Sequence, residues 1–540
     1  MSNETKRTPV RQLVIGVDAM EWTLVRKWMA EGKLPALQQI AAHGSQTGLQ
    51  SFAECVPDAV WTTFSYGVNP GKLEKYFYVH YDHKLGRLRY AHDHELRGKP
   101  FWLYLAAAGR KVVVADLPHV PHHAIPNGAL LMNWGAHDNK HNLMVHPASL
   151  AGEVGRRFGR HPVEDCERYN HTLRSKRRLR RDILAGIRKH GELFRWLMQS
   201  QPWDVLVCCF SAAHSGGHHF WGHMDSSHRD HRPGDPLGFE DTVEQIYRAI
   251  DREIGEMVEQ ASENTRAIVF APHGMGQLSH ASWNLNEMLE LWGFANRGER
   301  PSPPAERRGR INPWRILKMV FPAQWQYAIK ERLPRSLQEQ LIILWYAGRS
   351  RFAGRRAFAV PNNEIVGAIR ISLKGRDRDG LVEQGDEYRR LREQIREALL
   401  ELTDPVTGRP VAKSVHFLHD RFHGPFVEQL PDITVFWDPT FAWDAVHSPR
   451  FGTLHLKLQD ARSGSHAANG FLLARGPGVR RDATAEGATP LDLAASVLEA
   501  AGVAIPEHFD GRPLPMLRLP PHRHESDRGR QHAKSATELV

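Results

Sequence analysis

An alternation of short apolar runs with amphipathic stretches is the feature that most limits what this chain can fold into. The apolar runs lie at 12–19, 111–117, 203–210, 266–272 and 470–476, and helices are predicted at 21–42, 98–109, 177–200, 239–262 and 490–502. Strands that alternate with helices predict an α/β fold with a mostly parallel sheet covered by helices on both faces. Within 21–42, Pro35 predicts an internal break.

Acidic and imidazole side chains lie close to the ends of these runs. They are Asp18, His214, His218, His273 and, just before the last run, His466. Open α/β sheets bind ligands beyond the carboxyl ends of their strands, so we expect these five side chains to converge on one site. The sequence holds 32 histidines, and imidazole is a common metal ligand, so metal chemistry is expected there.

The alternation is interrupted after residue 295, which predicts more than one structural part. We expect a first part of the main core at 8–295, a Pro/Arg-rich insertion with helices at 296–356, a small β-rich cap subdomain at 357–425, a return to the core at 426–516, and a disordered polar tail at 517–540. The run at 431–438 is expected to join the main sheet together with the last strand. The insertion is interpreted as a lid or a partner surface.

Composition places the chain among globular proteins, since 41% of its 540 residues are hydrophobic and 24% are charged. No apolar run reaches the roughly 18 to 20 residues of a membrane span, and the first residues do not resemble a signal peptide. Four cysteines, at 55, 166, 208 and 209, are too few for a disulfide scaffold, and Cys55 is interpreted as structural. A cytoplasmic protein without a membrane partner is expected.

The formal net charge of +10 indicates affinity for anions. The basic residues gather at 174–181, 306–310 and 348–356, but no nucleic-acid-binding motif accompanies them. Nucleic acid is therefore not the favoured partner, and a small phosphorylated substrate is.

Several segments together resemble the type I phosphodiesterase/nucleotide pyrophosphatase family of the alkaline phosphatase superfamily. They are VIGVDAMEWT with the helix after it, VPDAVWTTFSYGVNPGK (56–72), FSAAHSGGHHFW (210–221), APHGMGQ (271–277), SGSHAANGFLLARGPGV (463–479) and 489–514. The resemblance covers the order of the whole chain. It implies an alkaline-phosphatase-like core and a metal-dependent hydrolase of phosphate esters, a phosphodiesterase or nucleotide pyrophosphatase.

The resemblance also implies a first metal site, formed here by His214, His218 and His466. Three histidines suit zinc, because neutral imidazole is a good ligand and three protein ligands leave a fourth position open. One zinc ion is expected on these residues.

A second metal site is implied at Asp18 and His273. The resemblance places a further aspartate and a nucleophilic Thr or Ser there, but this sequence has Pro272 and Pro57 at those two positions. Proline supplies neither a ligand nor a hydroxyl, so the second metal is expected to be absent or weak unless a displaced residue such as Asp58, Thr62 or Thr63 completes the site.

Two mechanisms remain open for the expected hydrolysis. Thr62 or Thr63 could act as a displaced nucleophile that forms a covalent intermediate. Alternatively, zinc held by three histidines could lower the pKa of a bound water to about 7, so that hydroxide attacks directly. The residues present favour the second scheme.

Four residues outside the metal positions are candidates for binding substrate. His137 and Asp138 follow an expected strand, and Lys374 and Arg376 belong to a basic turn of the expected cap subdomain, where they could meet a phosphate group.

Two other functions stay open at this point. The chain could be a degenerate superfamily member that binds a ligand or partner without catalysis, as the two prolines would suggest. It could also hydrolyse sulfate or phosphonate esters, which related enzymes cleave.

Overall fold

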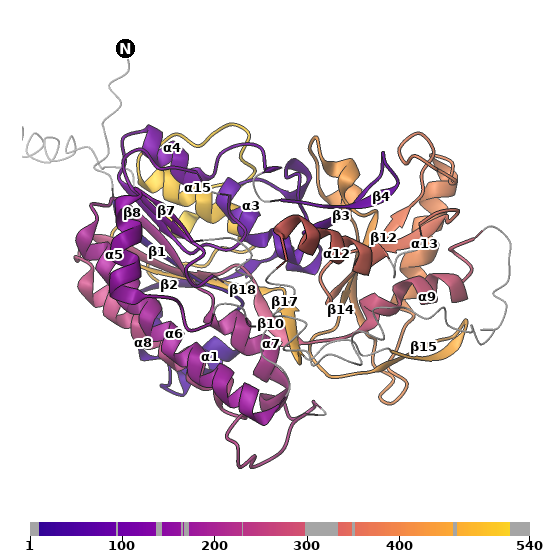
Figure 1. The fold of residues 1–540 in the computed structure, drawn as a ribbon, viewed down its shortest axis with the longest axis horizontal. Coiled ribbons are helices and arrows are strands. Elements are labelled where there is room, and N and C mark those ends of the chain that lie inside the picture. Colours follow the sequence, from indigo (N-terminus) through magenta and orange to yellow (C-terminus); the bar gives the residue numbers. More distant parts are fainter. Residues whose placement is uncertain are drawn as a thin grey trace, which may run out of the picture.

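The computed structural model describes most of the chain (Figure 1). The described ranges are 10–92, 95–121, 123–136, 143–163, 166, 172–228, 230–296, 333–347, 352–456 and 462–518. The candidate residues His137 and Asp138, most of the expected insertion and nearly all of the expected tail lie outside these ranges. In the part described, no helix combines the length and the apolar composition that crossing a membrane requires.

An eight-stranded sheet forms the larger half of the molecule. Its strands, in spatial order, are β2 (Gly44–Gln50), β18 (Asn469–Arg475), β9 (Thr265–Ala271), β1 (Arg11–Val17), β8 (Val205–Phe210), β5 (Val112–Ala115), β6 (Ala129–Met132) and β7 (Met144–His146). The neighbours from β9 to β6 are parallel. The α/β prediction with a mostly parallel sheet is therefore confirmed.

The last apolar run differs from the prediction in its direction. It forms β18, which pairs antiparallel with both β9 and β2. A parallel neighbour would need a long crossover connection. Here β18 follows strand β17 (Gly464–Ala467) after Ala468 alone, so the chain enters the sheet from its opposite end.

Helices cover both faces of the large sheet (Figure 1). One face carries α1 (Trp22–Ala30), α2 (Pro35–Ala42), α5 (Ser149–Phe158), α6 (Leu173–Ser200) and α8 (Thr242–Gln260), and the other carries α3 (Val60–Tyr66), α4 (Phe101–Ala107) and α15 (Pro490–Ala500). Two separate apolar cores result, one on each face. Pro35 begins α2, a position where its missing N–H costs no helical hydrogen bond.

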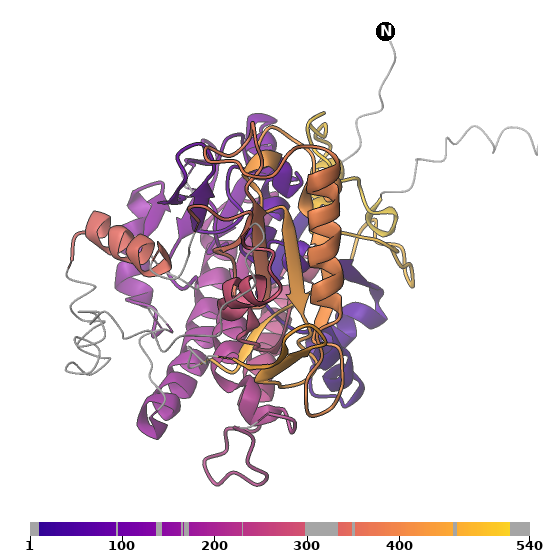
Figure 2. The same ribbon diagram turned by 90° about the vertical axis from the view of Figure 1, so that its right-hand side faces the viewer.

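A second, antiparallel sheet forms the smaller half. Its order is β11 (Ala357–Val360), β12 (Val366–Ile371), β14 (Ile433–Trp437) and β13 (Ala412–Phe417). Figure 2 shows α13 (Asp386–Leu400) alongside it, and α9 (Leu285–Leu291) also packs there. The prediction that 431–438 joins the main sheet is wrong. Strand β14 lies between β12 and β13 in the smaller sheet instead. Both of its edges are hydrogen-bonded there, so neither edge is left to pair with a strand of the main sheet.

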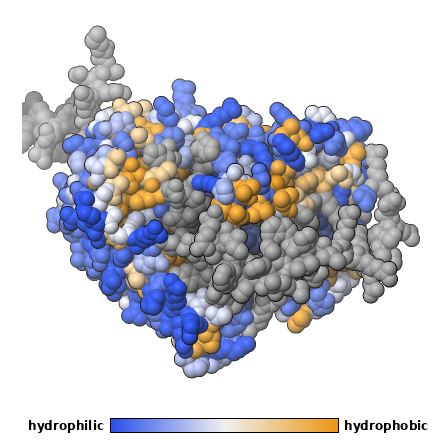
Figure 3. Space-filling model, viewed as in Figure 1, coloured by the Kyte–Doolittle hydropathy of each residue, from blue (hydrophilic) through white to orange (hydrophobic). Residues whose placement is uncertain are grey.

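One helix of the expected insertion is described, α12 (Arg335–Ala347). Its residues Ile342, Ile343 and Tyr346 pack on an apolar cluster beside the smaller sheet. Leu344 and Trp345 are exposed, and Figure 3 shows hydrophobic surface in the region where Figure 1 places this helix.

The remaining elements connect the two halves or decorate the smaller one. They are α7 (Ala212–Met224), β10 (Gly274–Gln277), the ribbons β3 (Val79–Asp82) with β4 (Arg87–Tyr90) and β15 (Ala445–Ser448) with β16 (Gly452–His455), and α14 (Leu418–Arg421). Strand β10 follows β9 closely and pairs antiparallel with β17. Helix α7 and this two-stranded ribbon lie at the carboxyl ends of β8 and β9, where a site was expected.

Candidate metal centre

Helix α7 supplies two of the histidines predicted to bind metal. It begins right after β8, and residues four apart on a helix lie on one face, so His214 and His218 point to the same side. Gly217 lets the helix approach the β10–β17 ribbon, since a Cβ there would lie 2.6 Å from the Met275 side chain. Both imidazoles are buried.

Strand β17 supplies the third histidine, His466. Its neighbour across the ribbon is Met275. The strand lies hard against α7, because a Cβ on Gly464 would be 2.4 Å from the carbonyl oxygen of Gly217. Ser463 strengthens the contact, with its N–H donating to the carbonyl of His218 at 2.8 Å.

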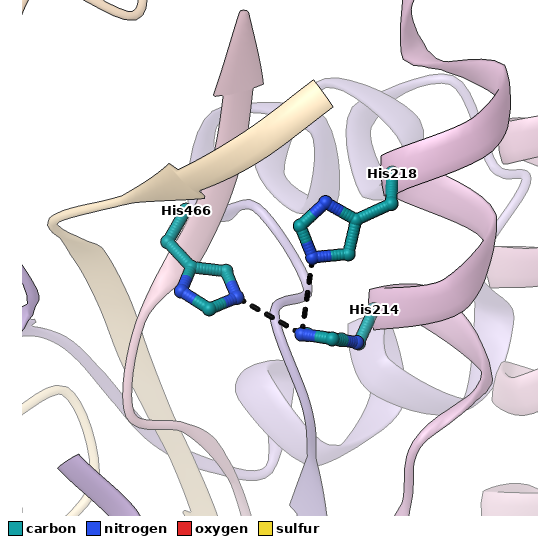
Figure 4. Close-up of side chains that lie close together, drawn as sticks. All are labelled: His214, His218 and His466. Atoms are coloured by element: carbon teal, nitrogen blue, oxygen red, sulfur yellow. Dashed lines mark hydrogen bonds between the residues drawn. The ribbon is translucent and has the colours of Figure 1, made fainter. Parts of the chain in front are cut away.

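The three rings meet at one point (Figure 4). The Nε2 atom of His214 lies 2.9 Å from Nε2 of His466 and 3.2 Å from Nε2 of His218. One ligand atom from each residue lies within 4.8 Å of the others. Such spacing matches the edges of a small coordination polyhedron, as zinc–nitrogen bonds are about 2.0–2.1 Å long.

His218 is held in its neutral form. Its Nδ1 donates to the carbonyl oxygen of Gly464 at 2.7 Å, which leaves the lone pair on Nε2 facing the other two rings. Burial lowers the pKa of His218 well below its ordinary value, and the nearby positive charge of Arg462 lowers this pKa further. A neutral imidazole is the form that binds a metal.

Asp18 and His273 form a second group beside the three histidines. Asp18 follows β1, His273 follows β9, and the two strands are neighbours, so Oδ1 of Asp18 lies 3.2 Å from Nε2 of His273. The His273 and His466 rings lie 4.5 Å apart, centroid to centroid, and are tilted by 48°. The structure thus brings all five predicted strand-end residues together.

The turn after Asp18 is strained. Ala19 has a φ of 57°, in the left-handed region that non-glycine residues rarely adopt, and its side chain is fully buried. This conformation costs about 1 kcal/mol or more, so the surrounding packing must hold it. The strain turns the chain sharply where the aspartate ends the strand.

The residues at the first position fit a zinc ion. Three buried imidazoles, one of them fixed with its lone pair inward, form a neutral nitrogen donor set, and neutral nitrogen ligands suit zinc.

The residues at the second position do not fit a metal in the same way. In the part of the chain that the structure describes, no further His, Cys, Asp or Glu joins Asp18 and His273 to make a group of three. Pro57 begins a short 3-10 helix and Pro272 follows β9, so neither position offers a donor. Two protein ligands are too few for a stable site.

The candidate nucleophiles lie in α3, and their hydroxyls are hydrogen-bonded to backbone carbonyls. Thr62 Oγ1 donates to the carbonyl of His119 at 3.2 Å, and Thr63 Oγ1 donates to the carbonyl of Val60 at 2.8 Å. Both side chains are buried. The structure brings neither hydroxyl into the bonded network of the histidines.

Asp58 has a closer connection to the centre. Its Oδ1 accepts a 3.3 Å hydrogen bond from the Asn363 amide, and the Oδ1 of Asn363 lies 3.4 Å from the Ser465 hydroxyl. Ser465 immediately precedes His466. Asp58 is therefore linked to the third histidine through two intervening side chains.

The basic residues predicted to bind substrate are engaged inside the smaller half. The Arg376 guanidinium is buried and bonds the carboxylates of Asp432 and Asp377. Burial opposes the charge of Asp432, but Arg376 outweighs it and holds the pKa of that carboxyl well below its ordinary value. Lys374 pairs with Glu383 at the surface. The structure does not bring Lys374 or Arg376 to the histidines.

A second group of potential metal ligands consists of Glu54, Cys55 and His416. The Nη1 atom of Arg421 lies 2.7 Å from the Glu54 carboxylate, 3.3 Å from the Cys55 sulfur and 3.1 Å from Nδ1 of His416. A guanidinium thus already supplies the positive charge in this group. Burial also raises the pKa of Cys55 to about 12, so its thiol stays protonated, which supports the structural interpretation.

The roles of two residues at the centre were not predicted from the sequence. Trp61 donates its indole N–H to Oδ1 of Asp18 at 2.7 Å, and nothing in the local pattern marks a buried tryptophan as a hydrogen-bond donor. Gly464 sets the distance between α7 and β17, and the small residues of the Ser-Gly-Ser segment were a usable signal for close approach.

Comparison with solved structures places this architecture among known folds. Phosphonoacetate hydrolase from Sinorhizobium meliloti 1021, in complex with phosphonoacetate, matches with a TM-score of 0.50 and 13% identity over 92% of this chain and 96% of that chain. Murine ectonucleotide pyrophosphatase / phosphodiesterase 5, in complex with AMP, matches with a TM-score of 0.45 and 14% identity over the same shares. The first likeness shows a shared fold, an α/β core of the alkaline phosphatase type.

The family follows from the sequence match. A family model described as type I phosphodiesterase / nucleotide pyrophosphatase matches residues 12–450, and the chain belongs to this family. A search of the curated proteins finds no match.

Proposed function

We propose that this protein is a metal-dependent hydrolase of phosphate esters that acts on a phosphodiester or a nucleotide-like pyrophosphate. The observation that carries the proposal is the cluster of three buried imidazoles, His214, His218 and His466, at the carboxyl end of β8 in a chain of this family. Their nitrogen donor set favours zinc as the metal.

The chain's own residues supply a preorganised centre. Zinc, when bound, supplies a Lewis acid for a phosphoryl oxygen and lowers the pKa of a coordinated water. His218 presents a fixed lone pair, and Asp18 and His273 line the neighbouring position with one carboxylate and one imidazole. The net charge of +10 favours approach of an anionic, small phosphorylated substrate.

A metal-ligand variant tests the proposal directly. Purified full-length chain loaded with zinc should hydrolyse bis(4-nitrophenyl) phosphate, and His218→Ala should lose both the metal and at least about a hundredfold of the rate. His223→Ala is the matched control, because His223 lies on the same helix but contacts Lys176. It should keep metal and activity.

Other outcomes would favour the alternative functions. Cleavage of sulfate or phosphonate esters, with no phosphate ester hydrolysed, would assign the centre to those substrates. Inactivity on all three ester types with zinc bound would favour a protein that binds a ligand without catalysis. Full metal content in His218→Ala would contradict the site assignment.

We propose a cytoplasmic location and a two-part organisation of the chain. Cys55, Cys208 and Cys209 are buried, which supports a reducing, cytoplasmic location. The two sheets support a division between an alkaline-phosphatase-like core and a smaller subdomain that includes 357–425.

A further inference from the structure

The neighbour of the three-histidine site differs from a metal site in a specific way. Asp18 and His273 face each other at 3.2 Å, while the two remaining positions expected to carry ligands are Pro57 and Pro272. The pair is buried, with Asp18 at 0% and His273 at 2% exposure. A divalent ion here would lose its hydration shell and gain only one carboxylate and one imidazole as protein ligands. Two ligands do not compensate the free energy of desolvation.

The indole of Trp61 takes part in the same position. Its N–H donates to Oδ1 of Asp18 at 2.7 Å, and this is the oxygen that faces His273. A cation bound between the carboxylate and the imidazole would have to compete with that bond. The indole therefore satisfies, with a neutral donor, an oxygen that would otherwise be available to a metal.

Packing prevents the indole from moving aside. Trp61 is 2% exposed, and its ring lies 5.5 Å from Phe270 and 6.1 Å from Phe64, centroid to centroid. The far edge of the ring lies over β1, where a Cβ on Gly16 would be 2.6 Å away. The glycine leaves room for the ring, and the aromatic contacts fix it.

We propose that Trp61 closes the second metal position, so that this protein holds one metal, on His214, His218 and His466. Asp18 and His273 then act as positioning residues. The Asp18 carboxylate fixes His273, and the His273 ring supports the ring of His466. This inference rests on the proposed function only in that the three histidines bind a metal.

Metal stoichiometry tests the inference without an activity assay. Each full-length variant is dialysed against excess zinc and then buffer, and bound zinc is counted by mass spectrometry, with cobalt(II) titration as a second count. Wild-type protein should hold one equivalent. Asp18→Asn and His273→Ala should also hold one, since neither side chain carries the metal.

Reopening the position provides the stronger test. Pro272→Asp should restore a third ligand yet keep one equivalent while Trp61 is present, and Trp61→Phe combined with Pro272→Asp should hold two. The matched control is Trp102→Phe combined with Pro272→Asp. Trp102 is a buried tryptophan of α4, so this substitution also removes a buried indole, but one that lies elsewhere. It should hold one.

The outcomes separate the two proposals. Two equivalents in the wild type, or in Pro272→Asp alone, would overturn closure by Trp61 and leave the proposed function intact. A folded double variant with one equivalent would overturn it as well. If that variant does not fold, the count for Pro272→Asp alone decides, because this variant supplies the third ligand while Trp61 is still present. Zero equivalents in the wild type would overturn both proposals.

Discussion

Single side chains decide which chemistry the centre can perform. Proline at 57 and 272 offers no side-chain atom that could bind a metal or attack phosphorus. The hydroxyls of Thr62 and Thr63 in α3 are hydrogen-bonded to backbone carbonyls. A threonine nucleophile would have to break such a bond and leave a buried carbonyl without it, at a cost of about 1–3 kcal/mol.

Alanine at Thr62 or Thr63 separates a nucleophile from a structural hydroxyl. We expect each variant to keep the rate on bis(4-nitrophenyl) phosphate within about threefold and to lose about 1 kcal/mol of unfolding free energy, the typical worth of one hydrogen bond. Steady-state kinetics and urea unfolding measure the two effects. A rate loss of about a hundredfold in either variant would instead identify that threonine as the nucleophile.

Asp18 is expected to matter for rate more than for metal content. Asp18→Asn keeps an oxygen for the Trp61 N–H but removes the charge that faces His273. We expect kcat to fall by about 10–100-fold, as for residues that orient metal ligands, with bound zinc unchanged. Measuring kcat and zinc content on the same preparation checks this, and unchanged kcat would remove Asp18 from the site.

At the scale of elements, the centre depends on how closely α7 and the β10–β17 ribbon approach. The helix sets the spacing of two histidines by itself, whereas the third, His466, lies on a strand 252 residues after His214 in the chain. Gly464 controls this approach, since any side chain there meets the backbone of α7.

Gly464→Ala should therefore weaken the metal site. Its Cβ would lie 2.4 Å from the Gly217 oxygen, so β17 must shift and carry His466 with it. We expect zinc affinity to fall at least about tenfold, with about 1–3 kcal/mol lost from stability through overpacking. Competition with a chromophoric chelator measures the affinity. Gly155→Ala, a helical glycine of α5 with open space around it, is the control and should leave the affinity unchanged.

At the scale of the whole molecule, buried histidines away from the centre link stability to pH. Burial lowers the pKa of His161 to about 4. The pKa of His80 is also well below its ordinary value, mainly because of burial and further because of the positive charges of Arg89 and Lys75. Nε2 of His80 accepts the backbone N–H of Tyr76 at 3.2 Å, and Nδ1 of His161 donates to the carbonyl of Val163 at 2.8 Å. Burial of both rings favours their neutral forms in the folded state.

The folded protein should lose stability as pH falls below about 6.5. There the unfolded chain binds protons on these histidines and the folded chain does not, so each contributes a loss of about 1.4 kcal/mol per pH unit, for His161 down to about pH 4. Urea unfolding at pH 7, 6 and 5 measures the slope. His161→Gln should show a smaller slope, and an equal slope would contradict the assignment.

Much of the fold and of the site could be predicted from local patterns. Buried strands and amphipathic helices are properties of contiguous residues, and the rule that ligands bind beyond strand ends then groups Asp18 with four histidines. The spacing of His214 and His218 already indicates one helix face.

The tertiary structure alone decided the rest, because it depends on pairing between segments far apart in the chain. Strand partners cannot be deduced from one strand's composition, which is why β14 lies in the smaller sheet and β18 runs antiparallel. Hydrogen-bond partners are equally nonlocal. The alternation of strands and helices determined the α/β architecture, whereas three-dimensional packing decided that the Trp61 indole, and not a threonine hydroxyl, bonds to Asp18.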